Sequence, residues 1–128
     1  KALCEKNAAS EGVASRCVFQ HGDAKQLDFP DESFDVVISN YVYHNVMGAD
    51  MQKLLLESLR VLKKGGVFAL NDDMKQKMYG DMEDFAQKLR DMGYEEVRLV
   101  DTAQEAFGSH RRAAMMMLGS SRLLVGRE

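Results

Sequence analysis

Side chains that could do chemistry follow two predicted strands at the points where those strands end. The first strand, Val18–Gln20, is followed by Asp23, and the second, Phe34–Ser39, is followed by Asn40 and Tyr41. In an open α/β sheet, ligands bind in the crevice beyond the carboxyl ends of the strands. We therefore expect the binding site at these two strand ends.

The segment after the second strand adds aromatic rings and an imidazole. Tyr41 or Tyr43 could place an aromatic face beside a cationic group, which such faces attract. His44 could accept a proton from an oxygen or nitrogen nucleophile. The alternative is that His44 is a hydrogen-bonded packing residue beside the tyrosines, and the sequence leaves both interpretations open.

A third predicted strand, Val67–Leu70, also ends in polar residues, Asn71, Asp72 and Asp73. Paired carboxylates could hold a metal ion or take part in acid–base chemistry. Because no third ligand lies at a suitable spacing, we predict no metal site.

The predicted elements alternate between strands and helices. The run from Val36 to Ile38 is continuously apolar, which predicts a strand buried on both faces of a parallel sheet. Helical periodicity and capping residues predict helices over Lys1–Glu11, Asp50–Lys64 and Asp81–Met92. Two later strands are expected at Val97–Val100 and Arg122–Val125.

A long connection, Asp101–Ser121, separates the last two predicted strands and is expected to hold a short helix. It contains the methionine cluster Met115 to Met117. Methionines usually serve as adaptable packing, which is the expectation here. The alternative is that they line an apolar substrate pocket or a partner surface.

Composition indicates one domain over residues 1–128, with 45% hydrophobic residues. The net charge of −3 indicates no general attraction to nucleic acid or to anionic membranes, and no apolar run has the length of a membrane span. Cys4 and Cys17 are too few for a disulfide scaffold and are expected to pack as small hydrophobes. A cytoplasmic location fits this composition.

Two segments together resemble class I S-adenosylmethionine-dependent methyltransferases, of the small-molecule group. The first runs from Gly22-Asp23-Ala24 through Leu27 to Ser39, and the second runs from Arg60 to Phe68. The resemblance implies a Rossmann-like, doubly wound α/β fold with three layers, a mostly parallel sheet and an antiparallel last strand. It also implies a domain that is incomplete at its N-terminus. The family's first strand, its glycine-rich turn and its second strand would precede Lys1.

The resemblance further implies methyl transfer from S-adenosylmethionine to a small-molecule acceptor by in-line displacement. Asp23 and Ala24 would bind the adenine of the cofactor, and Asn40 and Tyr41 would lie near the reacting centre, with His44 as the candidate base. For Asp23 the residues alone leave a second interpretation open, in which its carboxylate only turns the chain.

Other functions are weighed against this one. A non-catalytic methyltransferase-like module that serves as a scaffold is the main alternative, because no glycine-rich cofactor turn is present. A nicotinamide-dependent oxidoreductase lacks its dinucleotide fingerprint. Without the family's first two strands, the strand edges at Val18–Gln20 and Phe34–Ser39 would be exposed. This predicts poor solubility, local rearrangement or a homo-oligomer paired through those edges.

Overall fold

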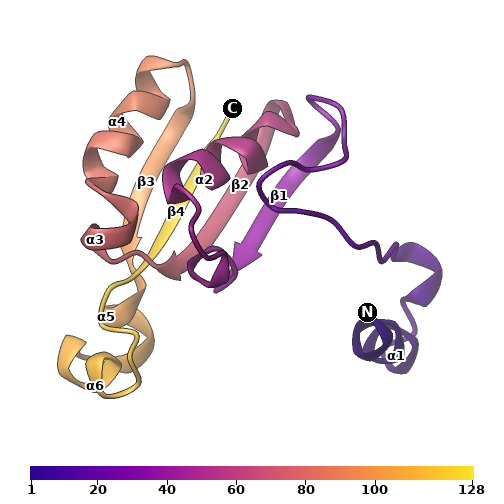
Figure 1. The fold of residues 1–128 in the computed structure, drawn as a ribbon, viewed down its shortest axis with the longest axis horizontal. Helices are drawn as coiled ribbons and strands as arrows, with labels where there is room; N and C mark the ends of the chain where they lie inside the picture. Colours follow the sequence, from indigo (N-terminus) through magenta and orange to yellow (C-terminus); the bar gives the residue numbers. More distant parts are fainter.

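Four strands form one sheet in the order β1-β2-β4-β3 in the computed structural model, which describes all 128 residues (Figure 1). β1 and β2 are parallel, whereas β4 runs antiparallel to both of its neighbours. The α/β class and the antiparallel last strand are therefore confirmed. The bounds are β1 Phe34–Asn40, β2 Leu62–Asp73, β3 Glu95–Asp101 and β4 Ser121–Arg127.

The chain also forms six helices and two short 3₁₀ turns, of which α1 and η1 precede β1 and the others connect the strands. They are α1 Ala2–Ser10, η1 Ala14–Arg16, η2 Tyr43–Asn45, α2 Met51–Arg60, α3 Gln76–Tyr79, α4 Met82–Asp91, α5 Thr102–Phe107 and α6 His110–Met115. No helix has the length and apolar character needed to cross a membrane.

Aspartate caps begin the two main helices where the sequence predicts them. The Asp50 carboxylate accepts from the backbone N–H of Lys53 at 3.2 Å, and Asp81 caps α4 in the same way. The helix predicted to reach Lys64 instead ends at Arg60, and β2 already begins at Leu62. These residues form a strand and not a helix because Leu62 pairs with Phe34. A bulge then separates this pair from the next one, Val36 with Val67.

A single core joins α2 and α4 to one face of the sheet, and Figure 1 shows both helices in front of the strands. The apolar stripe predicted for α2 is buried there. The sixteen buried members of the core are Tyr43, Met51, Leu54, Leu55, Leu59, Leu62, Phe68, Leu70, Met74, Tyr79, Met82, Phe85, Ala86, Leu89, Val97 and Leu124.

The second face of the sheet is open at β1. Val36 is 55% exposed and Ile38 is 76% exposed, although their neighbour Val37 packs against the core. The prediction that this strand is buried on both faces is therefore wrong. β1 lies at the edge of the sheet, so only one of its faces and one of its edges have a partner.

The N-terminal segment lies away from the sheet. Figure 1 shows α1 and η1 joined to the rest of the chain by an extended connection. The predicted helix over Lys1–Glu11 is confirmed as α1, but residues Val18–Gln20 form no strand and Val18 is 90% exposed. A strand needs a neighbour to pair its backbone groups, and none lies beside this segment. Cys4 is exposed, so its predicted packing role is wrong.

The connection between β3 and β4 forms two short helices, α5 and α6, at the end of the sheet where β1 and β2 terminate (Figure 1). Met115, Met116 and Met117 are 82%, 65% and 76% exposed, so the expectation that they pack in a core is wrong.

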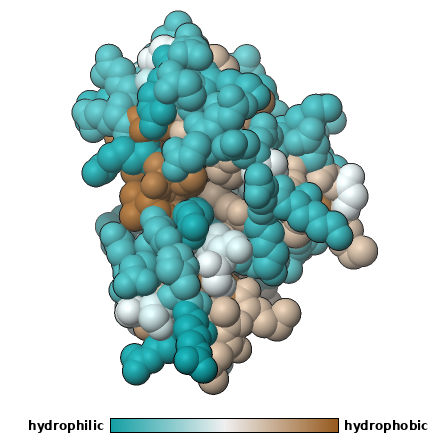
Figure 2. Space-filling view, turned by 90° about the vertical axis from the view of Figure 1, so that its left-hand side faces the viewer, coloured by the Kyte–Doolittle hydropathy of each residue, from teal (hydrophilic) through white to brown (hydrophobic).

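Figure 2 views the side that carries α3, α4 and β3. Hydrophilic side chains frame one apolar patch there.

Candidate functional site

An imidazole and a buried carboxylate meet at the carboxyl ends of β1 and β2. Nδ1 of His44, in η2, lies 2.5 Å from Oδ1 of Asp72, near the end of β2. The Asp72 side chain is fully buried, whereas that of His44 is 32% exposed. The pair thus joins an inaccessible anion to a ring that faces outward.

Backbone donors surround the Asp72 carboxylate. Oδ2 accepts from the N–H groups of Tyr43 at 2.8 Å and of His44 at 3.4 Å, and Oδ1 accepts from the N–H of Asp73 at 2.7 Å. A buried charge is tolerated only when it is paired and hydrogen-bonded, and Asp72 meets that condition. The same contacts hold η2 in place, so they fix the position of the His44 ring.

The carboxylate also fixes which nitrogen of His44 carries the proton. An ionised carboxylate only accepts hydrogen bonds, so Nδ1 of His44 is the donor. In the neutral ring the lone pair is then on Nε2, which makes no hydrogen bond within the chain. This arrangement suits a general base, because the carboxylate stabilises the imidazolium that forms when Nε2 takes up a proton.

Two tyrosines pack beneath the dyad on the core side. The Tyr43 hydroxyl donates to Oγ of Ser58 at 2.9 Å, which ties η2 to α2. Burial is the main cause of a raised pKa at Tyr43, and it also raises the pKa of Tyr79, with the nearby charge of Asp72 as a second cause. Both hydroxyls therefore stay neutral at physiological pH, and neither competes with His44 as a base.

Tyr41 lies next to the dyad. Its ring packs edge-on against that of His44, with 6.5 Å between the ring centroids. Its backbone is left-handed, with φ at +53°, and its hydroxyl lies 2.6 Å from Oγ of Ser121 in β4. The strand end thus brings together the predicted aromatic face and the predicted base.

Asn40 and Ala24 line one open pocket of about 510 Å³, together with apolar side chains that include Val37 and Ile38. The Asn40 Oδ1 accepts from Nδ2 of Asn71 at 2.8 Å, which links the ends of β1 and β2. Tyr41 and His44 are not among the lining residues. Two of the predicted site residues, Ala24 and Asn40, therefore share this pocket, whereas Tyr41 and His44 lie together at the dyad.

Asp23 stands apart from both groups. Its Oδ1 accepts from the backbone N–H of Lys25 at 2.9 Å, and its carbonyl oxygen accepts from the N–H of Gln26. The turn interpretation of Asp23 is thus seen directly. Its second carboxylate oxygen accepts no hydrogen bond within the chain.

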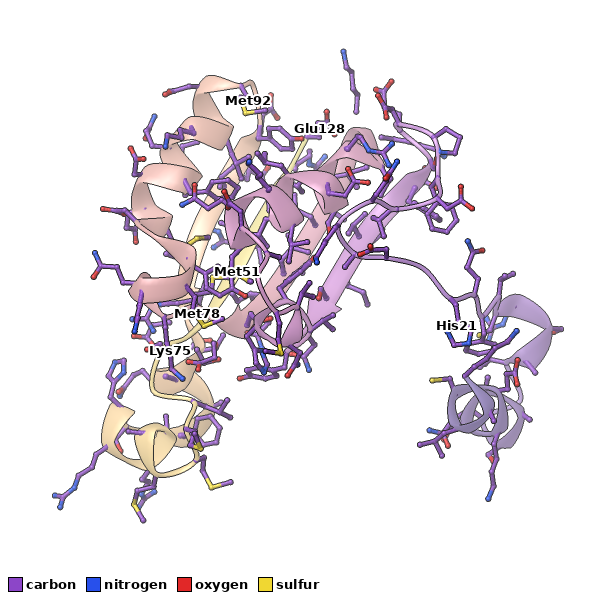
Figure 3. All side chains as sticks on the ribbon, in the orientation of Figure 1. His21, Met51, Lys75, Met78, Met92 and Glu128 are labelled. Carbon is purple, nitrogen blue, oxygen red and sulfur yellow. The ribbon has the colours of Figure 1, made fainter.

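Other ionisable groups lie outside this arrangement. Asp73 pairs with Lys75 at 2.7 Å, and Figure 3 shows Lys75 at the end of the sheet nearest α5 and α6. Figure 3 also places His21 on the N-terminal segment, far from the sheet. No group of three or more His, Cys, Asp or Glu side chains is arranged to hold a metal ion.

Sequence reasoning missed the partners of the predicted residues. In the sequence Asp72 stands out only as a metal or acid–base candidate, and Ser121 does not stand out. The sequence does hold a signal for Asp72. It lies at the carboxyl end of a predicted buried strand, and that strand is the next one along the chain after the strand that precedes His44. Ser121 gave no such signal, because its contact with Tyr41 depends on where β4 enters the sheet.

Known proteins resemble this chain in sequence. A family model described as a methyltransferase domain matches residues 1–70, more than half of the chain. The chain is 32% identical over 102 residues to 27-O-demethylrifamycin SV methyltransferase from Amycolatopsis mediterranei, covering 80% of this chain and 36% of that protein. It is 36% identical over 72 residues to the sterol 24-C-methyltransferase erg6 of Aspergillus fumigatus, covering 56% and 19%.

Solved structures share the fold at low sequence identity. The cyclase SpnF matches 99% of this chain and 61% of its own, with a TM-score of 0.68 and 18% identity. Geranyl diphosphate C-methyltransferase from Streptomyces coelicolor A3(2) matches 96% and 58%, with a TM-score of 0.66 and 11% identity. These matches confirm the Rossmann-like class. The chain spans about a third or less of the length of the two curated relatives.

Proposed function

The chain belongs to the methyltransferase domain family, the class I S-adenosylmethionine-dependent methyltransferases, and from this premise we propose that it carries out methyl transfer to a small-molecule acceptor. The observation that carries the proposal is the His44–Asp72 dyad beside Tyr41 at the carboxyl ends of β1 and β2. That edge of the sheet is where α/β folds bind their ligands. The small-molecule acceptor is supported by the similar methyltransferases, which are named for a rifamycin, a sterol and geranyl diphosphate.

The residues at the end of β1 and in the loop before it suit S-adenosylmethionine. Ala24 and Asn40 border a pocket with apolar walls, and Asp23 keeps one carboxylate oxygen free for an amine. Tyr41 offers an aromatic face, which favours a cationic group. When bound, the cofactor supplies an electrophilic methyl group on a sulfonium. In this proposal Asp23 and Ala24 hold the adenine, and Asn40 and Tyr41 hold the part nearest the sulfonium.

His44 has the geometry for the proton transfer that accompanies the reaction. A hydroxyl or amine acceptor must lose its proton as it is methylated, and Nε2 of His44 is the atom that can take it. Asp72 keeps the lone pair on Nε2 and stabilises the resulting imidazolium. The base can therefore act without reorganising its surroundings.

The first test is calorimetric titration of the full-length natural protein with S-adenosylhomocysteine, followed by turnover on a panel of hydroxyl- and amine-bearing small molecules. Binding and transfer are expected. We expect His44→Gln to lower the transfer rate by about 10²-fold or more, the usual contribution of a general base. His21→Gln is the matched control, because His21 lies far from the sheet. No cofactor binding by the full-length protein would overturn the proposed function.

We further propose that the free edge of β1 pairs with a second copy of this chain. Ile38, on the open face of that strand, is 76% exposed, and an unpaired strand edge is a template for another strand. Light scattering is expected to show a dimer that Ile38→Lys dissociates. Leu3→Lys, a change at an apolar residue of α1 that is 69% exposed, is expected to leave the mass unchanged. A wild-type monomer at high concentration would contradict this pairing.

A non-catalytic partner module is the alternative function, and the same open strand edge favours it. The cofactor titration separates the two, since a scaffold predicts pairing without S-adenosylhomocysteine binding. A cytoplasmic location stays a prediction from the sequence.

A further inference from the structure

A chain of hydroxyl and amide groups ties Tyr41 to three other elements. The Tyr41 hydroxyl lies 2.6 Å from Oγ of Ser121 in β4, and this Oγ lies 2.8 Å from Oγ1 of Thr102 at the start of α5. Thr102 Oγ1 donates to Oδ1 of Asn71 at 3.1 Å, and Nδ2 of Asn71 donates to Oδ1 of Asn40. β1, β2, β4 and α5 therefore meet in one hydrogen-bonded path.

The direction of every hydrogen bond in this path follows from counting protons. Each hydroxyl has one proton, and that of Thr102 goes to Asn71. Thr102 must therefore accept from Ser121, which leaves Ser121 to accept from Tyr41. The Tyr41 proton is committed to Ser121. Towards a ligand, Tyr41 can offer only the lone pairs of its oxygen, which accept hydrogen bonds, and its ring face, which attracts a cation more than a neutral group.

Ser121 also has the position needed to hold the Tyr41 ring in place. Its side chain is fully buried, so it is fixed by the sheet. Tyr41 has a left-handed backbone with φ at +53°, a conformation that costs a non-glycine residue free energy and persists only when neighbouring contacts hold it. The hydroxyl contact with Ser121 is the only hydrogen bond of the Tyr41 side chain.

We propose that Ser121 and Thr102 are positioning residues that hold Tyr41 so that the site prefers the cationic sulfonium of S-adenosylmethionine over the neutral thioether of S-adenosylhomocysteine. The inference rests on the proposed function for its ligand. It goes further by assigning a role to β4 and α5 in discriminating substrate cofactor from product cofactor.

The test compares the two ligands on the full-length natural protein by calorimetry. In Ser121→Ala the affinity for S-adenosylmethionine is expected to fall about fivefold, within the range of one cation–π contact, and the affinity for S-adenosylhomocysteine much less. Ser120→Ala is the matched control, because its hydroxyl makes no side-chain hydrogen bond and the residue is adjacent in sequence. Equal weakening for both ligands, or none, would overturn the inference.

Two further variants separate positioning from general damage to the fold. Tyr41→Phe keeps the ring and removes the hydroxyl, so it should match Ser121→Ala, and the double variant should show no additional loss. Thr102→Val interrupts the path one step further from Tyr41 and serves if Ser121→Ala does not fold. Additive losses in the double variant would contradict a shared path.

A readout without ligand keeps the inference separate from the proposed function. In spectra of protein with ¹³C-labelled tyrosine, Ser121→Ala is expected to shift the Tyr41 ring resonances, whereas Ser120→Ala is not. If the wild-type protein binds neither ligand, the proposed function fails, and the spectra alone decide whether Ser121 positions Tyr41. Unchanged Tyr41 resonances in Ser121→Ala would overturn that role.

Discussion

At the scale of single residues, the site depends on one carboxylate that the solvent does not reach. Asp72 has no exposed surface, and it is compensated by three backbone N–H groups and by Nδ1 of His44. Such a group is costly to leave unpaired, so its neighbours are held tightly around it. The fixed position of the His44 ring is thus a consequence of the burial of Asp72.

This argument predicts the effect of Asp72→Asn. An amide cannot stabilise an imidazolium as a carboxylate does, and it can hold the ring in the wrong tautomer, so transfer should slow by about 10²-fold or more. The measurement is the transfer rate, with ¹⁵N spectra of His44 reporting its tautomer. Asp73→Asn is the control, because Asp73 is also buried but pairs with Lys75 instead. An unchanged rate with an unchanged tautomer would show that His44 acts without Asp72.

At the scale of elements, one arginine holds the loop before β1 against α2. Arg60 donates to the carbonyl oxygens of Leu27 and Phe29, and its guanidinium also pairs with Asp31 and Glu57. Glu57 in turn accepts from the N–H of Leu27 at 2.7 Å. The contact with Arg60 is the main cause of a lowered pKa at Glu57. The loop is therefore shaped by a planar group that reaches several acceptors at once.

Arg60→Lys is expected to lower the free energy of unfolding by about 1–2 kcal/mol, because an ammonium cannot reproduce the forked contacts to two carbonyls and two carboxylates. Denaturant unfolding measures this loss. Asp31→Asn supplies the comparison: it removes only a pair with a 73% exposed carboxylate, which contributes about 1 kcal/mol or less. Equal losses in the two variants would mean that the surface pair, and not the fork, is what matters.

The elements also show which parts of the fold the sequence could predict. α2 and α4 were predictable because their caps and apolar stripes are local signals. The strand predicted at Val18–Gln20 failed because its apolar residues have no neighbouring strand, and pairing is not a local property. The prediction that the second helix reaches Lys64 failed for a related reason. β2 begins at Leu62, because the pairing of Leu62 with Phe34 overrides the helical pattern before it.

At the scale of the whole molecule, the order of the strands decides what the site contains. His44 and Tyr41 could be singled out because they follow a predicted strand. Ser121 lies 80 positions from Tyr41, and the two meet only because β4 enters the sheet beside β2. The sequence therefore singled out residues that meet at the end of β1, but not the residue of β4 that contacts Tyr41.

Two buried tyrosines, Tyr43 and Tyr79, and the partly buried Tyr94 give the whole molecule a predictable response to alkali. Burial is the main cause of a raised pKa at Tyr43, Tyr79 and Tyr94, and it brings that of Tyr94 to about 12, with the charge of Glu128 contributing. The unfolded chain releases these protons near the ordinary value of about 10, so above that pH it binds fewer protons than the folded chain. The full free energy of unfolding is therefore present below about pH 10, and part of it is lost as the pH rises through the pKa values of these tyrosines in the folded chain.

Each of these three tyrosines should then lower the free energy of unfolding by about 1.4 kcal/mol per pH unit between its unfolded and folded pKa values. Denaturant unfolding at a series of pH values from 8 to 12 measures the slope. Tyr94→Phe keeps the edge-on ring contact with Phe68 but removes one titrating hydroxyl, so its slope should be shallower than that of the wild type. Identical slopes would mean that Tyr94 titrates alike in the folded and unfolded chains. The alkaline loss would then come from groups other than the Tyr94 hydroxyl.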